Sequence, residues 1–194
     1  MFTRTETLSS PAGYNARRLL LVFLSLLFLG GHTAIGATPE VSKEYQVKAA
    51  FLYNFTKFVE WPPSRFPDTT GPIVIAVLGR NPFGEDLAAI VRERKVNGRE
   101  LVVKTVSTAD EAATAHLLFV GADEEARLAG KMESLQKAGV LTVGESPRFI
   151  ASGGIINFTL ETDKVRFQIN PRAGEQAGLK ISAQLLKLAM IVRK

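Results

Sequence analysis

One stretch near the start of this chain is too apolar to be a one-sided surface helix. It runs from Glu44 to Pro62 with the sequence EYQVKAAFLYNFTKFVEWP. A surface helix has one apolar stripe and a polar remainder. Residues 49–53 are instead consecutively apolar or aromatic, so apolar groups point in every direction at that level of the helix. The sequence therefore predicts a helix over residues 44–62 that is buried between two layers or covered by a partner.

The first residues of the chain indicate its compartment. Two arginines precede an uncharged apolar run over residues 19–29, and small residues follow as far as Ala37. This order is typical of a secretory signal peptide, and the run is shorter than the roughly 20 residues that span a bilayer. We predict a cleaved signal peptide over residues 1–37, with the cut after Gly36 or Ala37, and export of the mature protein. The alternative is an uncleaved anchor.

Composition narrows the classes of function. Residues 38–194 have the length of one ordinary domain. The net charge of the chain is +5, and the leader contributes +2 of this through three arginines and Glu6. Basic residues are interspersed with acidic ones, which is unlike the clustered cations of a nucleic-acid-binding face. The chain has no cysteine, which excludes disulfides, thiolate metal sites, cysteine nucleophiles and lipid attachment.

Three short, largely apolar runs predict buried strands. They cover residues 73–78, 117–120 and 140–143, and a glycine follows each of them. Runs that are apolar on both faces suit a sheet covered by helices on both sides. Helical spacing over residues 83–94 and 124–138 separates them, and strands that alternate with helices predict a parallel sheet. A further strand over residues 101–106 and a short helical piece over residues 110–114 complete this region.

The C-terminal part breaks this rhythm. Residues 155–160 and 165–169 alternate between apolar and polar side chains around a polar turn, which predicts an antiparallel hairpin. A final helix is expected from about Ala173, with an apolar face that includes Leu179 and Leu185. The predicted fold class is α/β: a mostly parallel central sheet flanked by helices, with a C-terminal antiparallel hairpin and a terminal helix.

Residues that carry catalysis are scarce in this sequence. His116 is the one histidine after the leader, and a lone histidine at the start of an apolar strand is more often packed than functional. No spacing of His, Asp and Glu predicts a metal site. Gly153 and Gly154 precede a strand, whereas phosphate-binding glycines stand between a strand and the following helix. We predict no catalytic residues, no metal and no cofactor.

One strand-to-helix junction is a candidate ligand site. Gly79, Arg80 and Asn81 follow the strand over residues 73–78, and α/β folds bind small ligands at such junctions. Arg80 is therefore a candidate contact for an anion. The alternative, which we favour, is a plain turn in which Pro82 begins the next helix.

The aromatic residues of the first helix are candidates for contact with a partner protein. Most are expected in the core, but one or two are predicted to stay near the surface, as tryptophan and tyrosine do at binding hot spots. The candidate contacts are Tyr53, Phe58 and, before all others, Trp61. Arg172 is a further candidate because it could pair with a partner's carboxylate. Asn157 and Asn170 are expected to satisfy backbone groups where the hairpin meets the final helix.

Several blocks of the sequence resemble the YfiR-like family of exported proteins. The opening helix over residues 44–62 is similar to the first helix of that family. A second set comprises GESPRF over residues 144–149, GGIINF over 153–158, VRFQIN over 165–170 and AGLKIS over 177–182. The likeness covers essentially all of residues 38–194, and its middle is looser than its two ends.

The resemblance implies a small α/β periplasmic protein without enzymatic activity, commonly dimeric. In the best-understood branch of the family, such a protein represses an inner-membrane diguanylate cyclase by binding its periplasmic sensor region, and an outer-membrane lipoprotein can sequester it. Members often carry paired cysteines, one of them just before the third strand, where this chain has Ala115. Redox control of folding or repression is therefore not expected here.

Three functions remain open from the sequence. The preferred one is a regulator, with a role in cyclic-di-GMP signalling and biofilm formation, that binds and represses a membrane-bound diguanylate cyclase or sensor kinase. The second is a periplasmic protein that binds a small molecule around Arg80 or in an apolar pocket lined by the first helix. The third, a hydrolase, is disfavoured because partners for general acid–base chemistry are missing.

Overall fold

The computed structural model describes residues 39–192, apart from 67 and 69. The predicted signal peptide over residues 1–37 lies outside the described residues. The main sheet has eight strands in the order β10-β8-β7-β6-β5-β2-β4-β3, and β1 and β9 form a separate two-stranded sheet. The strands are β1 (Val59–Glu60), β2 (Ile73–Leu78), β3 (Lys95–Val96), β4 (Arg99–Val106), β5 (Leu117–Val120), β6 (Leu141–Gly144), β7 (Ile156–Glu161), β8 (Lys164–Ile169), β9 (Lys180–Ile181) and β10 (Met190–Ile191).

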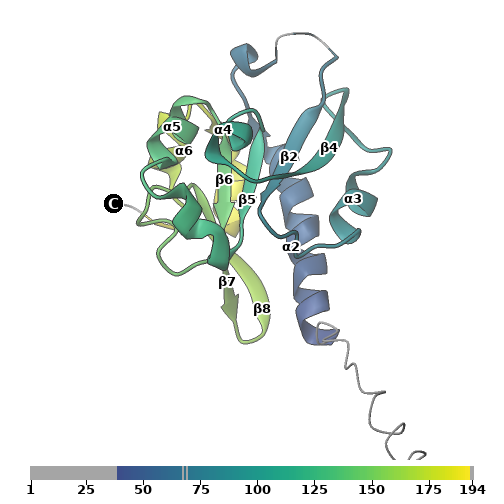
Figure 1. Ribbon diagram of the computed structural model, residues 1–194, viewed down its shortest axis with the longest axis vertical. Coiled ribbons are helices and arrows are strands. Elements are labelled where there is room, and N and C mark those ends of the chain that lie inside the picture. The colour runs from purple at the N-terminus through teal and green to yellow at the C-terminus, as the bar shows by residue number, and fades with distance from the viewer. Residues whose placement is uncertain (1–38, 67, 69, 193–194) are drawn as a thin grey trace, which may run out of the picture. The chain divides into compact units, whose positions relative to one another are not determined.

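The helices are short except for the first. They are α2 (Pro39–Phe58), α3 (Asp86–Val91), α4 (Ala109–Ala112), α5 (Met132–Lys137), α6 (Pro171–Gln176) and α7 (Ala183–Leu188), with 3₁₀ turns η1 (Pro63–Arg65) and η2 (Ala122–Leu128). In Figure 1, α2 runs along one side of the sheet with α3 beside it, and the β7–β8 hairpin projects from the sheet.

The centre of the sheet is parallel and covered on both faces. Strand β2 pairs in parallel with β4 and β5, and β5, β6 and β7 continue the parallel run. On β2, Ile75 and Val77 join the core cluster that contains α2 and α3, whereas Ala76 and Leu78 join the cluster under α4, η2 and α5. A strand buried on both faces must be apolar at every position. The predicted fold class and these predicted strands are confirmed.

Two antiparallel hairpins extend this sheet at its ends. Strands β7 and β8 pair antiparallel, as predicted. Strands β3 and β4 form a second hairpin around Asn97 and Gly98, which both have positive φ (52° and 80°). Positive φ at both central residues is the signature of the two-residue turn that Asn-Gly favours. The short strand β3 before this turn was not predicted from the sequence.

The helix predicted over residues 124–138 is wrong in its extent. The segment forms the 3₁₀ turn η2 and then the short helix α5. The break lies at Gly130, whose φ of +70° belongs to the left-handed region. Because a residue in that conformation cannot continue an α-helix, the apolar spacing seen in the sequence is divided between two separate pieces. The helix predicted over residues 83–94 is likewise shorter, since α3 covers only Asp86–Val91.

The single C-terminal helix is also a wrong prediction. Helix α6 ends before Gly178, which has a φ of +70°. The next residues form β9, which pairs antiparallel with β1, and α7 begins only after Ser182, whose side chain accepts a hydrogen bond from the Leu185 backbone N–H. This pairing of β9 with a strand about 120 residues away interrupts the helix that the apolar spacing of the segment predicted. The chain then adds β10 parallel to β8 at the edge of the sheet.

Two glycines near the hairpin allow a phenylalanine to approach the backbone closely. A Cβ atom on Gly144 would lie 2.3 Å from the Phe149 ring, and one on Gly154 would lie 2.2 Å from it. Gly153 has a φ of +97°, which favours glycine for a separate reason. Gly154 therefore permits the close packing of Phe149 before β7, and Gly153 permits the turn that leads to it.

Candidate functional site

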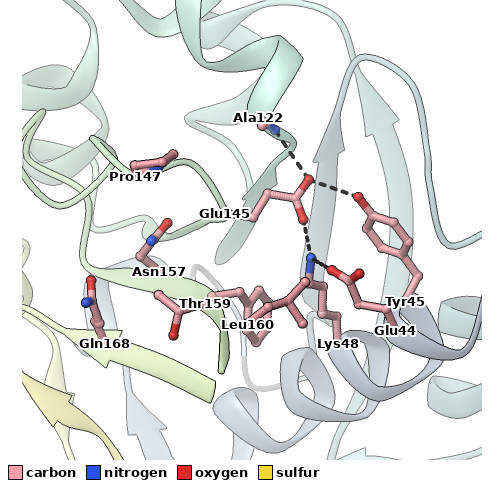
Figure 2. Close-up of a pocket in the computed structure, with 11 residues that line it drawn as sticks. Glu44, Tyr45, Lys48, Ala122, Glu145, Pro147, Asn157, Thr159, Leu160 and Gln168 are labelled. Carbon is pink, nitrogen blue, oxygen red and sulfur yellow. Dashed lines mark hydrogen bonds and ion pairs between the residues drawn. The ribbon is translucent and has the colours of Figure 1, made fainter. Parts of the chain in front are cut away.

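A pocket of about 500 Å³ opens at the carboxyl ends of the parallel strands. Figure 2 shows its lining: α2 contributes Tyr45 and Lys48 from one side, β7 and β8 lie opposite, and Glu145 directly follows β6. The residue after a buried parallel strand is held at the carboxyl edge of the sheet, where α/β folds commonly place ligand contacts. The sheet topology therefore brings together groups that are about 100 residues apart in the sequence.

A buried ion cluster forms one wall of this pocket. The Lys48 ammonium group, on a side chain 5% exposed, lies 2.6 Å from a Glu145 carboxylate oxygen and also contacts the Glu44 carboxylate. Glu145 additionally accepts hydrogen bonds from the Tyr45 hydroxyl at 3.0 Å and the Ala122 N–H at 3.3 Å. A buried charge is tolerated when it is paired and hydrogen-bonded in this way. The cluster ties α2 to the loop after β6.

Tyr45 acts as a hydrogen-bond donor in this cluster. Burial, followed by the charge of Glu145, raises the pKa of the Tyr45 hydroxyl well above its usual value. The Lys48 ammonium also lies 4.6 Å from the centroid of the Tyr45 ring. Tyr45 therefore stays protonated at physiological pH and contacts both partners of the central ion pair.

The opposite wall carries polar groups without partners inside the protein. Asn157 is only 2% exposed, and its Oδ1 atom has no hydrogen-bond partner among the described residues. Thr159, two residues along the same strand, has an equally buried and unpartnered Oγ1 atom. Buried polar atoms are nearly always hydrogen-bonded, so each exception needs an explanation. This pair marks the β7 wall as able to bind a polar group.

The charged groups of the pocket are paired with one another. The carboxylates of Glu44 and Glu145 are paired with Lys48, and no described nucleophile lies within hydrogen-bonding distance of a histidine base. Over residues 39–192, excluding 67 and 69, no group of three His, Asp or Glu side chains could hold a metal ion. Besides the ion cluster, the pocket is lined by the amides of Asn157 and Gln168 and by the Thr159 hydroxyl.

The prediction that Trp61 stays near the surface is wrong. The Trp61 side chain is 9% exposed, and its Nε1–H donates a hydrogen bond to the His116 carbonyl at 3.0 Å. The cause is the two-stranded sheet, which was not predicted. Because β1 pairs with β9 immediately before Trp61, the chain directs the indole ring into the core, where its single donor meets a carbonyl.

His116 is packed, as expected for a lone histidine. The ring is 6% exposed, and its Nδ1 atom accepts a hydrogen bond from the Val74 backbone N–H at 3.1 Å. Its Nε2 atom lies 3.2 Å from the Arg65 carbonyl oxygen, which requires a proton on Nε2. Burial, followed by the charge of Arg65, lowers the pKa of His116 to about 4. The ring is neutral and structural, stacked on Phe66 at 4.6 Å.

Tyr53 and Phe58 are half-buried on the side of α2 and remain candidate contacts for a partner. Both pack against the core with part of each ring. Arg94 lies over the Tyr53 ring, with its Cζ atom 4.8 Å from the ring centroid. These residues lie apart from the pocket, which is lined by the first turns of α2.

Arg80 lies on the surface at the end of β2, with a side chain 85% exposed. A carboxylate of the protein itself occupies the space over this junction: Glu124 accepts a hydrogen bond from the Arg80 N–H at 3.3 Å. A Cβ atom on Gly79 would lie 2.2 Å from that carboxylate group. The position an anion would take is therefore filled, and ligand binding by Arg80 stays an untested prediction.

The remaining predicted residues lie at the start of α6. Arg172 is exposed there. The Asn170 side chain accepts a hydrogen bond from the Ala173 N–H at 3.2 Å, which confirms its structural role as a helix cap. The same role for Asn157 is wrong, since within the described part of the chain its side chain makes no hydrogen bond to the backbone, and it lines the pocket.

The sequence reasoning missed the residues that build the pocket. Glu145 follows a predicted buried strand, and this position at the carboxyl edge was a usable signal. Lys48 and Tyr45 gave no signal, because nothing in a helix sequence indicates that a lysine will be buried against a glutamate 97 residues later. Asn157 was noticed but given a structural role.

The profile of a known family matches residues 45–190, and its description is YfiR/HmsC-like. The match covers well over half of the chain. The chain belongs to the YfiR/HmsC-like family. The YfiR/HmsC-like family is a regulatory family. Among the helices of the described region, none is both long and apolar enough to cross a membrane.

Other comparisons add little to the family assignment. The search of curated proteins finds no match. Among solved structures, a conserved domain protein from Vibrio cholerae O1 biovar El Tor is similar at 14% identity and a TM-score of 0.48, over 75% of this chain. An ABC domain in complex with L-Trp from Streptococcus pneumonia is similar at 12% identity and a TM-score of 0.47, over 77% of this chain. This chain spans 60% of the length of each, and likeness at this level supports no functional argument.

Proposed function

We propose that this protein binds a membrane-bound diguanylate cyclase from the periplasmic side and represses it. The observation that carries the proposal is membership of the YfiR/HmsC-like family over residues 45–190. Repression needs only that the protein binds the inactive state of its partner more tightly than the active state. A site of paired charges without an acid–base couple is consistent with such a binding role.

The proposal includes the way the protein reaches its partner. Residues 1–37 are a cleaved signal peptide, and residues 38–194 are the single regulatory domain. A related sensor kinase is the alternative partner, and an outer-membrane lipoprotein is the proposed sequestering protein. A homodimer is proposed because Leu188, Met190 and Ile191 expose apolar surface at the β10 edge of the sheet, and exposed edges and apolar patches favour pairing.

The test is a repression assay on a defined partner. The full chain, exported and carrying a C-terminal tag, is used to isolate membrane proteins, and any recovered cyclase is purified and assayed. Addition of the purified protein is expected to lower cyclic-di-GMP production by the reconstituted cyclase in a saturable manner. Production that stays constant at saturating protein would refute repression. Light scattering of the same sample tests the homodimer.

A second function, binding of a small molecule, is favoured by one specific observation. Asn157 and Thr159 present unpartnered polar atoms at the pocket beside Lys48 and Glu145. A ligand that hydrogen-bonds to the Asn157 amide would raise the melting temperature by mass action. A thermal-shift screen of periplasmic metabolites should give a shift that is lost in Asn157→Leu. A screen without any shift would remove this candidate.

A further inference from the structure

A second polar surface lies on α2, away from the pocket. It consists of Tyr53, Lys57, Phe58 and Arg94, here termed the Tyr53 patch. The Arg94 guanidinium carbon is 4.8 Å from the centroid of the Tyr53 ring, and the Lys57 nitrogen is 5.6 Å from it. Lys57 also lies 5.9 Å from the centroid of the Phe58 ring. Two cations are thus held against a half-buried aromatic surface.

Local structure explains why these residues meet. Lys57 follows Tyr53 by four residues, so the two side chains share one face of α2. Arg94 comes from the turn after α3, which lies beside α2 in Figure 1. Glu93 has a φ of +59°, and the Arg94 N–H donates to the Val91 carbonyl at 3.1 Å. This left-handed turn ends the helical region and directs the chain back towards Tyr53.

The charges of the patch are not neutralised by the protein. In the part of the chain that the structure describes, neither Lys57 nor Arg94 has a carboxylate within ion-pair distance, whereas Lys48 has two. A cation over a partly exposed ring gains only a small stabilisation. An arginine stacked on a ring keeps the donors at its edge for a carboxylate. The aromatic rings therefore hold the Lys57 and Arg94 side chains in place, and both charges stay available for a carboxylate.

We propose that the Tyr53 patch binds an acidic segment of a protein partner. Lys57 and Arg94 pair with two of its carboxylates, while Tyr53 and Phe58 contact its apolar atoms. Tyrosine and arginine are the residue types that dominate binding hot spots. An anionic membrane is the less suitable occupant, because membrane-binding segments typically concentrate about 4–8 cations. The inference rests on the proposed function, since it specifies the chemistry of the partner in that interaction.

The test uses a defined acidic probe rather than the unidentified partner. A fluorescent alanine-based helical peptide with glutamates four residues apart is titrated with the full-length protein, and anisotropy reports binding. Lys57→Glu combined with Arg94→Glu should weaken binding about tenfold or more. The matched control is Lys164→Glu combined with Arg166→Glu on the exposed β7–β8 hairpin, which changes net charge equally. The control should stay within about twofold of the native protein.

Three results would overturn the proposal. In the first, the native protein fails to bind the peptide. In the second, both double variants lose binding equally, which indicates general charge attraction. In the third, vesicles containing phosphatidylglycerol bind more tightly than the peptide through the same residues. Unfolding midpoints are measured for each variant. If the variant with Lys57→Glu and Arg94→Glu unfolds, a variant with Lys57→Gln and Arg94→Gln is tested in its place. Because the probe contains no cyclase, failure of repression and failure of the patch are separate results.

Discussion

The two ends of strands β5 and β6 differ in how completely their polar groups are satisfied. At the amino ends, the Trp61 indole donates to the His116 carbonyl, and both ring nitrogens of His116 have partners. The Arg65 Nε–H is the buried donor at this end that has no partner among the described residues. At the carboxyl ends, Lys48 and Glu145 are paired, but Asn157 and Thr159 retain buried oxygens without partners. At one end of these strands the indole and imidazole have all their hydrogen-bond partners. At the other end, the side-chain oxygens of Asn157 and Thr159 can still accept hydrogen bonds.

This difference assigns the two ends different contributions, the amino end to stability and the carboxyl end to binding. A satisfied buried network rigidifies the core, whereas a partly satisfied one costs free energy that a ligand or partner can recover. We therefore expect substitutions at the amino end to lower stability, and substitutions of the unpartnered groups at the carboxyl end to affect binding more than folding. The following measurements test this division, from the largest effect to the smallest.

Trp61→Ala is expected to lower the free energy of unfolding by about 3–5 kcal/mol, because it empties a buried indole site and removes a hydrogen-bond donor. Urea unfolding measures the change. Leu160→Ala, at a side chain 56% exposed, serves as the control and should change stability by less than about 0.5 kcal/mol. A folded and equally stable Trp61→Ala variant that lost only partner binding would restore the surface role predicted from the sequence.

Lys48→Met is expected to cost about 2–3 kcal/mol, because two partly buried carboxylates lose their cation. The cost stays below that of a fully buried pair, since the Glu44 side chain is 23% exposed. The control Lys137→Met breaks an exposed pair with Glu133 and should cost under about 1 kcal/mol. Adding Glu145→Gln to Lys48→Met should recover part of the loss. Full additivity of the two changes would show that the pair is not coupled.

Acidification is expected to destabilise the amino end through His116. Its pKa in the folded protein is about 4, below the ordinary value of 6.5, so the unfolded state binds the proton more readily between these values. Stability should therefore fall as pH decreases from about 6.5 to about 4, by roughly 1–3 kcal/mol in total. Hydrogen bonds lower the pKa values of Asp68 and Glu133, so their effects come at lower pH. The His116→Gln variant should lack this slope, and an unchanged slope would contradict the assignment.

Asn157→Leu gives the smallest and most discriminating change. The amide is buried without a partner for its oxygen, so an apolar replacement should leave stability unchanged or raise it by up to about 1 kcal/mol. Thr142→Val is the matched control, because Thr142 Oγ1 accepts a hydrogen bond from the Ile155 N–H at 3.2 Å. That variant should lose about 1 kcal/mol. Equal losses in both would show that Asn157 is satisfied and would remove the contrast between the two ends.

The parts of the fold that depend on local pattern were predictable. Strands β2, β5 and β6 were recognised because strands buried on both faces are largely apolar. The helical segments were less accurate, since apolar spacing does not show where a glycine such as Gly130 or Gly178 adopts a positive φ. Strands β9 and β10 were missed because two-residue strands have no periodicity of their own.

The sequence by itself determined the fold class, the family and the scarcity of catalytic side chains, because each follows from residue type and order along the chain. Only the tertiary structure decided which side chains are buried. Trp61 turns inward because β1 pairs with β9, and Lys48 meets Glu145 because α2 packs beside the end of β6. Contacts between residues about 100 positions apart depend on topology, and a single sequence carries no local signal for them.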